Sequence, residues 1–362
     1  MRKGFVTGLA VVLLVALWAV QPAAALEVAG TVFEDANGNG ARDAGESVRG
    51  GVIVSDGKAV VRTDKGGAYS LGTEPGKIVF ASAPGTHHAP GNKFYRHIEN
   101  SSKAGAYDFG LVRNAGGGER FTLVFASDTQ VGFLRNAQKG TAKAYAEIMK
   151  QKPDLVIHGG DIIYDALNVD EELARRQYEL YVRELVPLIN VPLYHAVGNH
   201  DVYAWYSLPN PKKIPPLYGK GMYEKYMGPR YYSFNFDHCH FLILDSIARG
   251  TVSNGGVTYY GWIDQDQLEW LRKDLREIDR AMPVVLVTHI PTINALYSVF
   301  GLRGGLAVTP GGETVPKHQV SNFHELFGEV LKGYNFKLAL AGHHHTYEQI
   351  HWKDNAVDAQ FV

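Results

Sequence analysis

Residues 192–201, PLYHAVGNHD, show the pattern that recurs through the second part of this chain. An apolar run typical of a buried strand ends at Val197, and the polar tetrad Gly-Asn-His-Asp follows at once. In open α/β sheets, ligands bind in the crevice beyond the carboxyl ends of the strands. The stretch therefore predicts a strand that presents Asn199, His200 and Asp201 at a binding site.

Four more apolar runs end in residues that bind metals in proteins. The glycines before Asp161, Asn199 and His343 let the chain turn sharply off its strand and bring the backbone close to the site. Because the clusters stand at equivalent strand ends, we expect them to converge, although the first and last are more than 200 residues apart. The expected strands and the residues after them are 121–127 with Asp128 and Gln130, 154–158 with Asp161, 283–288 with His289, and 336–341 with His343 and His345.

Helices are expected between these strands, so this part is predicted to be an α/β domain with helices outside a largely buried sheet. In 264–279, apolar residues recur at spacings of three and four, which is typical of an amphipathic helix. The runs 231–236 and 240–245 predict an antiparallel pair of strands joined by a tight turn. The other expected helices are 136–151, 170–186 and 322–331.

The first part of the chain has a different pattern, in which short β-prone runs alternate with turn residues and no helical period is sustained. The runs 52–54, 59–61 and 77–80 are the clearest examples. This pattern predicts a small all-β sandwich domain. The expected division is a signal peptide at 1–25, the β-sandwich at 26–113, a glycine-rich linker at 114–119 and the α/β domain at 120–362.

The N-terminus is typical of a signal peptide. Arg2 and Lys3 precede an apolar run, and Ala23-Ala24-Ala25 offers small residues for cleavage. We therefore expect export to the periplasm or the outside of the cell, with a retained N-terminal anchor as the alternative. No transmembrane span is expected in the mature chain, because no second run is long and apolar enough. Without Arg2 and Lys3, 34 Lys and Arg stand against 37 Asp and Glu, so no basic surface for nucleic acid is evident.

The residue types after the five strands favour a particular class of metal. Asp, Asn, Gln and His form a mixed oxygen and imidazole set, which suits zinc, manganese, iron, cobalt or nickel and suits calcium poorly. Any one cluster has a simpler explanation, since a lone Gly-Asp is usually a turn and a lone His is usually a packed core residue. We interpret His158 and His195, inside their strands, as such packed residues, and we expect His344 to point away from the metals. Five clusters in order favour a metal site.

The five clusters resemble the motifs of the calcineurin-like metallophosphoesterases. The resemblance covers about 120–362 and implies a four-layer α/β/β/α sandwich with a dinuclear metal site on the loops at one edge. Relatives with such an N-terminal sandwich often continue into another C-terminal domain, so we expect this chain to be a fragment. The matching segments are Asp128-x-Gln130, Gly160-Asp161-x-x-Tyr164, Gly198-Asn199-His200-Asp201, Thr288-His289 and Gly342-His343-x-His345.

The resemblance also implies a role for each residue. Asp161 would bridge the two cations, which are expected to be manganese, iron or zinc. His200 would assist the leaving group while a hydroxide held between the cations attacks phosphorus, and Asp201 would orient the His200 imidazole. The implied ligands are Asp128, Gln130, Asp161 and His345 for one cation, and Asp161, Asn199, His289 and His343 for the other.

Two residues depart from the commonest form of these motifs. Gln130 stands where the family often has His, and its neutral amide oxygen is a weaker donor to a soft metal. Tyr164 stands where purple acid phosphatases place an iron-binding tyrosinate, although a tyrosine that only lines the site is the simpler interpretation.

A second ion site is expected in the first domain. Residues 35–46 fit a twelve-residue calcium loop with glycine at its sixth position, but the flanking runs predict strands instead of the helices of an EF-hand. The alternative is an ordinary Asn- and Gly-rich turn, and a bound calcium would be structural. The candidate ligands are Asp35, Asn37, Asn39, Ala41, Asp43 and Glu46.

The sequence thus predicts an exported, metal-dependent hydrolase of small phosphate mono- or diesters. The alternative is a cell-surface or matrix binding protein whose metal site has degenerated, and Gln130 is the one feature that favours it. Segments 202–228 and 290–319 are expected to be long loops that set substrate specificity.

Overall fold

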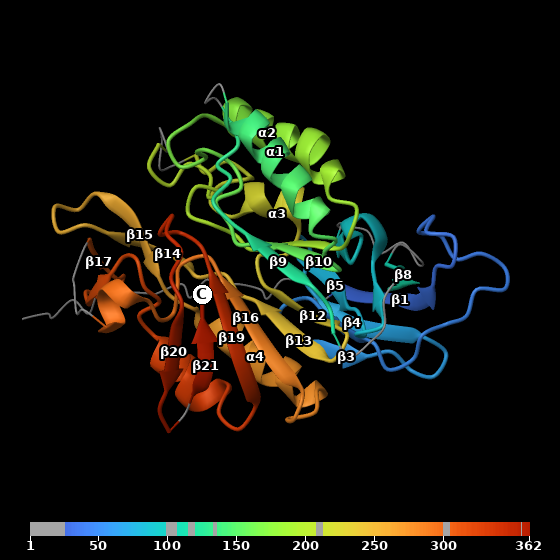
Figure 1. The fold of residues 1–362 in the computed structure, drawn as a ribbon. Coiled ribbons are helices and arrows are strands. Elements are labelled where there is room, and N and C mark those ends of the chain that lie inside the picture. The colour runs from blue at the N-terminus through green and yellow to red at the C-terminus, as the bar shows by residue number, and fades with distance from the viewer. Residues whose placement is uncertain are drawn as a thin grey trace, which may run out of the picture.

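The computed structural model describes residues 26–98, 107–114, 120–132, 136–207, 213–299, 305–355 and 357–362 (Figure 1). The expected signal peptide, 1–25, and residues 115–119 of the expected linker lie outside the described residues. Within the described ranges, no helix is long and apolar enough to cross a membrane.

The N-terminal part is all β, as its short β-prone runs predict. Its strands are β1 (Leu26–Glu34), β2 (Ile53–Ser55), β3 (Val60–Arg62), β4 (Ala68–Thr73), β5 (Ile78–Ser82), β6 (His87–His88), β7 (Tyr95–His97) and β8 (Phe109–Arg113). They form two four-stranded sheets, ordered β4-β1-β8-β6 and β3-β2-β5-β7. Buried and exposed residues alternate along β4, which is the period-two pattern of a strand with one face on the core.

The second part is built on two central sheets. Three parallel strands form the first sheet: β9 (Leu123–Ala126), β10 (Leu155–His158) and β11 (Leu193–His195). The second sheet contains β12 (Tyr232–Phe236), β13 (Cys239–Ile243), β16 (Pro283–Thr288), β19 (Asn335–Ala341), β20 (Ile350–Lys353) and β21 (Asp358–Phe361). In this sheet β13, β16 and β19 run parallel, whereas β12 pairs antiparallel with β13, so the expected hairpin is confirmed.

Helices cover the outer faces of these two sheets and complete the α/β/β/α layers (Figure 1). They are α1 (Ala137–Lys150) and α2 (Glu171–Leu180) on one side, and α4 (Gln265–Asp274) with the short α5 (Phe323–Glu325) on the other. Asp170 and Asp264 cap α2 and α4 by accepting hydrogen bonds from backbone N–H groups three residues on. The helical path continues beyond three of these helices as π or 3-10 turns, at Tyr181–Leu185 and Val186–Leu188, at Leu275–Glu277 and at Leu326–Val330.

A further four-stranded sheet and a further helix belong to this part, and the helix and two of the four strands lie in segments 202–228 and 290–319, which the sequence predicted as long loops. The sheet is ordered β15-β14-β17-β18, and it consists of β14 (Ile247–Thr251), β15 (Val257–Gly261), β17 (Leu306–Val308) and β18 (Thr314–Pro316). The helix α3 (Gly221–Met227) lies in the segment after β11. The strands β17 and β18 have three residues each, which is too short for a recognisable alternation.

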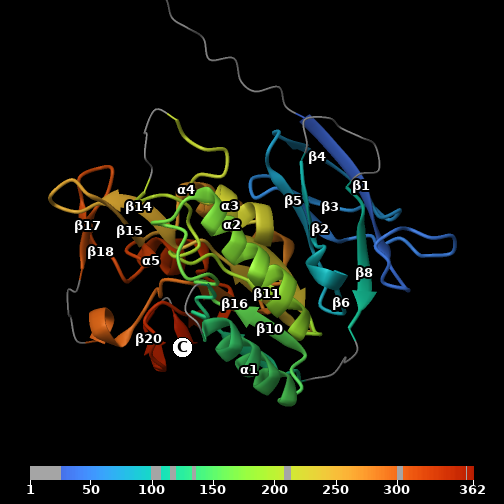
Figure 2. The ribbon, with the colours of Figure 1, turned by 90° about the horizontal axis from the view of Figure 1, so that it is seen from above.

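The N-terminal sheets lie directly beside the α/β domain (Figure 2). Backbone N–H groups of Asn235 and Asp237 donate to the carbonyls of Ala83 and Gly85, over 3.0 and 2.8 Å, so the chain after β5 adds to the edge of the second sheet. One continuous cluster of buried apolar residues runs through both parts. The two domains therefore share a core.

Candidate metal centre

The carboxyl ends of three parallel strands of the first sheet and two parallel strands of the second meet at one edge of the two central sheets. Asp128 follows β9, Asp161 follows β10 and Asn199 follows β11, all on the first sheet. His289 follows β16 and His343 follows β19, on the second sheet. The convergence expected from the sequence is therefore present in the fold.

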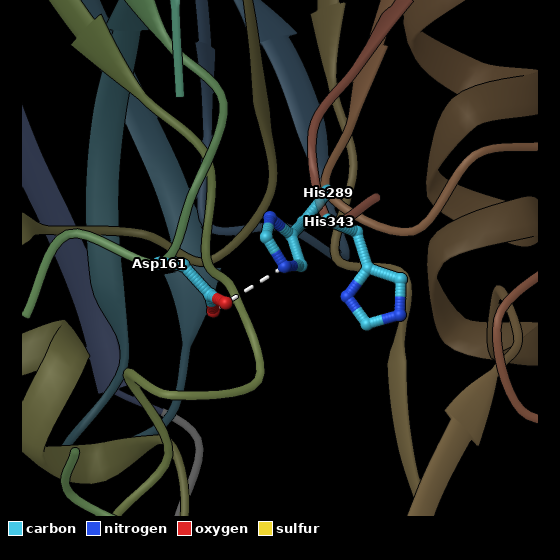
Figure 3. Close-up of side chains that lie close together, drawn as sticks. All are labelled: Asp161, His289 and His343. Atoms are coloured by element: carbon cyan, nitrogen blue, oxygen red, sulfur yellow. Dashed lines mark ion pairs between the residues drawn. The ribbon is translucent and has the colours of Figure 1, made fainter. Parts of the chain in front are cut away.

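Two groups of carboxylate and imidazole side chains are close enough to hold a cation, and both contain Asp161. One group is Asp161, His289 and His343, and the other is Asp128, Asp161 and His345. Within each group the ligand atoms lie within 4.8 Å of one another. Figure 3 shows Asp161, His289 and His343 facing a common point. Asp161 thus belongs to both groups, and its bridging of two cations, which the family resemblance implies, stays a prediction.

The His289 imidazole faces oxygen atoms on its Nε2 side. Its Nδ1 lies 2.8 Å from the Gly159 carbonyl, which can only accept, so Nδ1 carries a proton. Its Nε2 lies 3.3 Å from Asp161 Oδ1 and 3.2 Å from Asn199 Oδ1. Burial opposes protonation of this ring, but the Asp161 carboxylate outweighs it and raises the pKa of His289 to about 9. Two oxygens and one imidazole nitrogen converging in this way require either a proton or a cation between them.

The second group has an unsatisfied oxygen. Asp128 Oδ1 is buried and accepts no hydrogen bond from the described residues, although it lies 3.2 Å from His345 Nε2. Asp128 Oδ2 accepts from the backbone N–H of His343 at 2.9 Å, which ties the first strand end to the last. A buried carboxylate oxygen without a donor is costly, and a bound cation would satisfy it. The residues present therefore fit a metal pair.

Backbone strain is concentrated in the same residues. Nine described residues other than glycine have positive φ angles, and five of them are predicted ligands. Each such residue costs on the order of 1–3 kcal/mol, and strain of this kind gathers at functional sites. The five are Asp128 (57°), Gln130 (43°), Asp161 (52°), His343 (76°) and His345 (53°).

Two models of known protein families match this chain. Residues 121–347 match the model of the calcineurin-like phosphoesterases, and residues 36–114 match the model described as the N-terminal domain of calcineurin-like phosphoesterases. The chain belongs to the calcineurin-like phosphoesterase family. The predicted family, the fold and the class of enzyme are thereby confirmed.

The individual relatives share low sequence identity with this chain. A protein of Arcobacter nitrofigilis named probable glycerophosphodiester phosphodiesterase is 28% identical over 207 residues, which cover 56% of this chain and 61% of that protein. A dimetal phosphatase structure from Danio rerio has 18% identity and a TM-score of 0.43, and covers 67% of this chain and 86% of that one. A purple acid phosphatase structure from yellow lupin, Lupinus luteus, has 14% identity and a TM-score of 0.44, and covers 86% of this chain and 58% of that one.

One predicted contact of this calcineurin-like phosphoesterase is wrong. Asp201 does not hold the His200 imidazole, because its oxygens accept from the backbone N–H groups of Gly198, Ile162 and Ile163 at 2.8, 2.9 and 3.2 Å. Burial, assisted by the nearby Asp161 charge, raises the pKa of Asp201 to about 7. Asp201 therefore ties two of the ligand-bearing loops together.

His200 is oriented by a backbone group instead. Its Nδ1 contacts the Tyr164 carbonyl, and its half-exposed ring places Nε2 3.9 Å from Asp161 Oδ2. The same contact gives Tyr164 a backbone role in the site. The Gln130 backbone N–H donates to the Asp161 carbonyl at 3.0 Å. The Gln130 side chain stays a predicted ligand.

The buried histidines of β10 and β11 are packed and hydrogen-bonded, as predicted. His158 Nε2 lies 3.0 Å from Thr129 Oγ1, and His195 Nε2 lies 2.9 Å from the Tyr181 hydroxyl. Burial lowers the pKa of His158 to about 3, so this ring is neutral. The contact with Thr129 holds the loop between Asp128 and Gln130 in place.

One histidine beside the metal centre was not expected from the sequence. His318 Nδ1 lies 2.7 Å from His343 Nε2, and the two ring planes differ by 29°. His344 turns to the His318 carbonyl, with its Nε2 3.0 Å away. No motif in the sequence marks His318, which follows the short strand β18.

The expected calcium loop folds as a closed turn. Both Asp35 oxygens accept from the backbone N–H groups of Asn39 and Gly40, and Asp43 accepts from the side-chain amides of Asn37 and Asn39. The Glu46 carboxylate accepts from two more backbone groups of the loop, at residues 36 and 43. Calcium at Asp35, Asn37, Asn39, Ala41, Asp43 and Glu46 stays a prediction.

Proposed function

We propose that this protein is an exported, dimetal-dependent hydrolase of phosphate esters. The observation that carries the proposal is Asp161, a buried carboxylate shared by two groups of metal-binding side chains that come from both sheets. A carboxylate has two oxygens, so one residue can serve two cations at once. Two divalent cations stabilise the charges on the attacking and leaving oxygens of a phosphoryl group.

The family resemblance implies four ligands for each cation. Asn199, whose Oδ1 points at His289, extends the group formed by Asp161, His289 and His343. Gln130 extends the group formed by Asp128, Asp161 and His345, as the family resemblance implies.

His200 is placed to handle a proton. A carbonyl only accepts, so the contact with Tyr164 keeps a proton on Nδ1 and leaves Nε2 directed toward Asp161. When Nε2 is also protonated, it can donate to the oxygen that leaves phosphorus. The half-exposed ring is accessible to a substrate from outside.

A phosphodiester is the first substrate class to test. The name of the Arcobacter relative points to a glycerol-derived diester, and the chain spans 61% of that relative's length. Export rests on the composition of residues 1–25, and intact-mass analysis of protein from the native host tests it. A mature N-terminus at or near Leu26 supports cleavage, whereas an uncleaved Met1 contradicts it.

The hydrolytic proposal is tested with purified protein loaded with Mn²⁺. We expect release of nitrophenol from nitrophenyl phosphate diesters or monoesters. The rate should exceed the background rate only when the protein is loaded with metal. The variant Asp161→Asn should lose this activity because it removes the shared charge. A protein that binds two cations per chain but hydrolyses no ester in a broad panel would instead favour a binding protein with a degenerate site.

A further inference from the structure

The contact between His318 and His343 joins the inserted sheet to the metal centre. His318 follows β18, the edge strand of the sheet β15-β14-β17-β18, whereas His343 follows β19 of the second central sheet. The 2.7 Å separation between His318 Nδ1 and His343 Nε2 is within hydrogen-bond range. Their ring planes differ by 29°, with centroids 4.9 Å apart.

The position of His318 is determined by its surroundings on several sides. Its neighbour Lys317 donates a backbone hydrogen bond to the Gly305 carbonyl at 2.9 Å, which extends the pairing of β17 with β18 beyond Leu306 and Pro316. The Tyr259 ring of β15 meets both imidazoles edge-on, with centroids 6.2 Å from His318 and 5.8 Å from His343. The Lys317 ammonium lies over that same Tyr259 ring at 4.4 Å. The inserted sheet thus holds His318 against His343.

This contact has a consequence for the chemistry of His343. A neutral imidazole has one N–H and one lone pair, and the partner of one nitrogen determines which nitrogen carries the proton. His343 Nε2 is the nitrogen beside His318. Figure 3 shows the other ring nitrogen of His343 turned toward His289 and Asp161. Binding of a cation through Nδ1 therefore requires the proton on Nε2, and that proton requires an acceptor.

We propose that His318 is a positioning residue for the metal centre, which accepts the Nε2 proton of His343 and so presents the Nδ1 lone pair to a cation. This inference rests on the proposed function, because it concerns the same centre. It assigns a role to the β17–β18 hairpin of the inserted sheet, which lies in segment 290–319, predicted from the sequence only as a specificity loop. Partners of this kind around a metal ligand contribute about 10- to 100-fold to metal affinity.

Two variants separate the hydrogen bond from simple packing. His318→Phe keeps a flat ring against His343 and Tyr259 but removes the acceptor, and His318→Gln supplies an acceptor oxygen on a flexible side chain. The matched control is His324→Phe, because His324 is exposed on α5. Each protein is titrated with Mn²⁺ and with Zn²⁺ by calorimetry, and its folding is checked by circular dichroism.

We expect His318→Phe to bind one of two cations about 10- to 100-fold more weakly than the wild type. His318→Gln should regain most of that loss, and His324→Phe should match the wild type. If His318→Phe binds each of the two cations as tightly as the wild type does, the inference is overturned while the proposed function stays intact. If His318→Phe binds metal more weakly but the wild type hydrolyses no ester, the proposed function alone is contradicted. A wild type that binds no cation would contradict both.

A crystal structure of the metal-loaded wild type gives a test that does not depend on folding of the variants. The inference expects a cation on Nδ1 of His343, with Nε2 still within hydrogen-bond distance of His318. A cation on Nε2, with His318 displaced, would overturn it.

Discussion

At the scale of single residues, His200 stands apart from the ligands because its Nδ1 is held by the Tyr164 carbonyl and its Nε2 is directed at Asp161. We expect His200→Ala to lower kcat by about 10²- to 10⁴-fold, which is the usual contribution of a proton-transferring side chain. The metal content of the variant, measured by elemental mass spectrometry, should stay at the wild-type level. His238→Ala, at a half-exposed histidine of the β12–β13 turn, is the control. Loss of metal from His200→Ala would show that this residue is a ligand.

Asp201 is expected to act on stability, because its carboxylate accepts three backbone N–H groups in a buried place. In Asp201→Asn, an amide NH2 faces one of these donors, which costs about 1–3 kcal/mol of unfolding free energy. Urea unfolding measures this cost. The shape of the kcat profile against pH should not change. Unaltered stability together with a displaced pH profile would restore the role of Asp201 as the partner of His200.

The meeting of Asp128, Asp161, His289, His343 and His345 could be predicted from the sequence because each residue lies shortly after an apolar run. Their division between two cations is implied by the family resemblance and stays a prediction. The partner of His200 could not be predicted. Asp201 is adjacent to His200 in sequence, but the turn at 198–201 directs the carboxylate inward to Gly198 and Ile162. His318 could not be found either, since its contact with His343 depends on how the short strands β17 and β18 fold.

At the scale of elements, the turn after β11 has room only for glycine. A Cβ on Gly198 would overlap the backbone nitrogen and a side-chain oxygen of Asp161, and backbone cannot move aside cheaply. We expect Gly198→Ala to lower the unfolding free energy by about 1–3 kcal/mol or more and to weaken metal binding, as measured by urea unfolding and calorimetry.

The control for this substitution is Gly140→Ala in α1, where an added Cβ meets nothing within 4 Å. Removing a glycine from a helix should stabilise the protein by about 0.5–1 kcal/mol. Metal affinity in Gly198→Ala equal to that of the wild type would contradict the close approach of Gly198 to Asp161.

The main helices and strands could be predicted because amphipathic period and buried apolar runs are local signals. The expected helix 136–151 forms as α1, and the expected helix 170–186 forms as α2 with the π turn after it. The β17–β18 part of the inserted sheet could not be predicted, because three-residue strands depend on pairing with distant partners. Thr251 of β14 pairs with Val308 of β17, for example.

At the scale of the whole molecule, the two domains are joined by a polar and aromatic interface. Trp270 of α4 is fully buried, and its indole N–H donates to the Ser55 hydroxyl at 3.0 Å. Its ring also meets Phe80 of β5 edge-on, with centroids 6.2 Å apart. Sequence alone could not reveal this interface, since Ser55 and Trp270 are 215 residues apart.

We expect Trp270→Ala to lower the unfolding free energy by about 3–5 kcal/mol, because it empties a large buried site and removes the partner of Ser55. Trp352→Ala, at a half-buried tryptophan of β20, should cost clearly less. Urea unfolding followed by circular dichroism measures both. Two separate transitions in the wild type, with only one affected by Trp270→Ala, would contradict a shared core.

The central claim is that side chains from Asp128 to His345 meet around Asp161 and hold two cations. Crystals of the metal-loaded protein, measured at the absorption edge of the bound metal, test it most directly. We expect two anomalous peaks per chain, one on either side of Asp161, in the wild type, and loss of at least one peak in Asp161→Asn. A single peak away from Asp161, or two peaks that persist in Asp161→Asn, would contradict it.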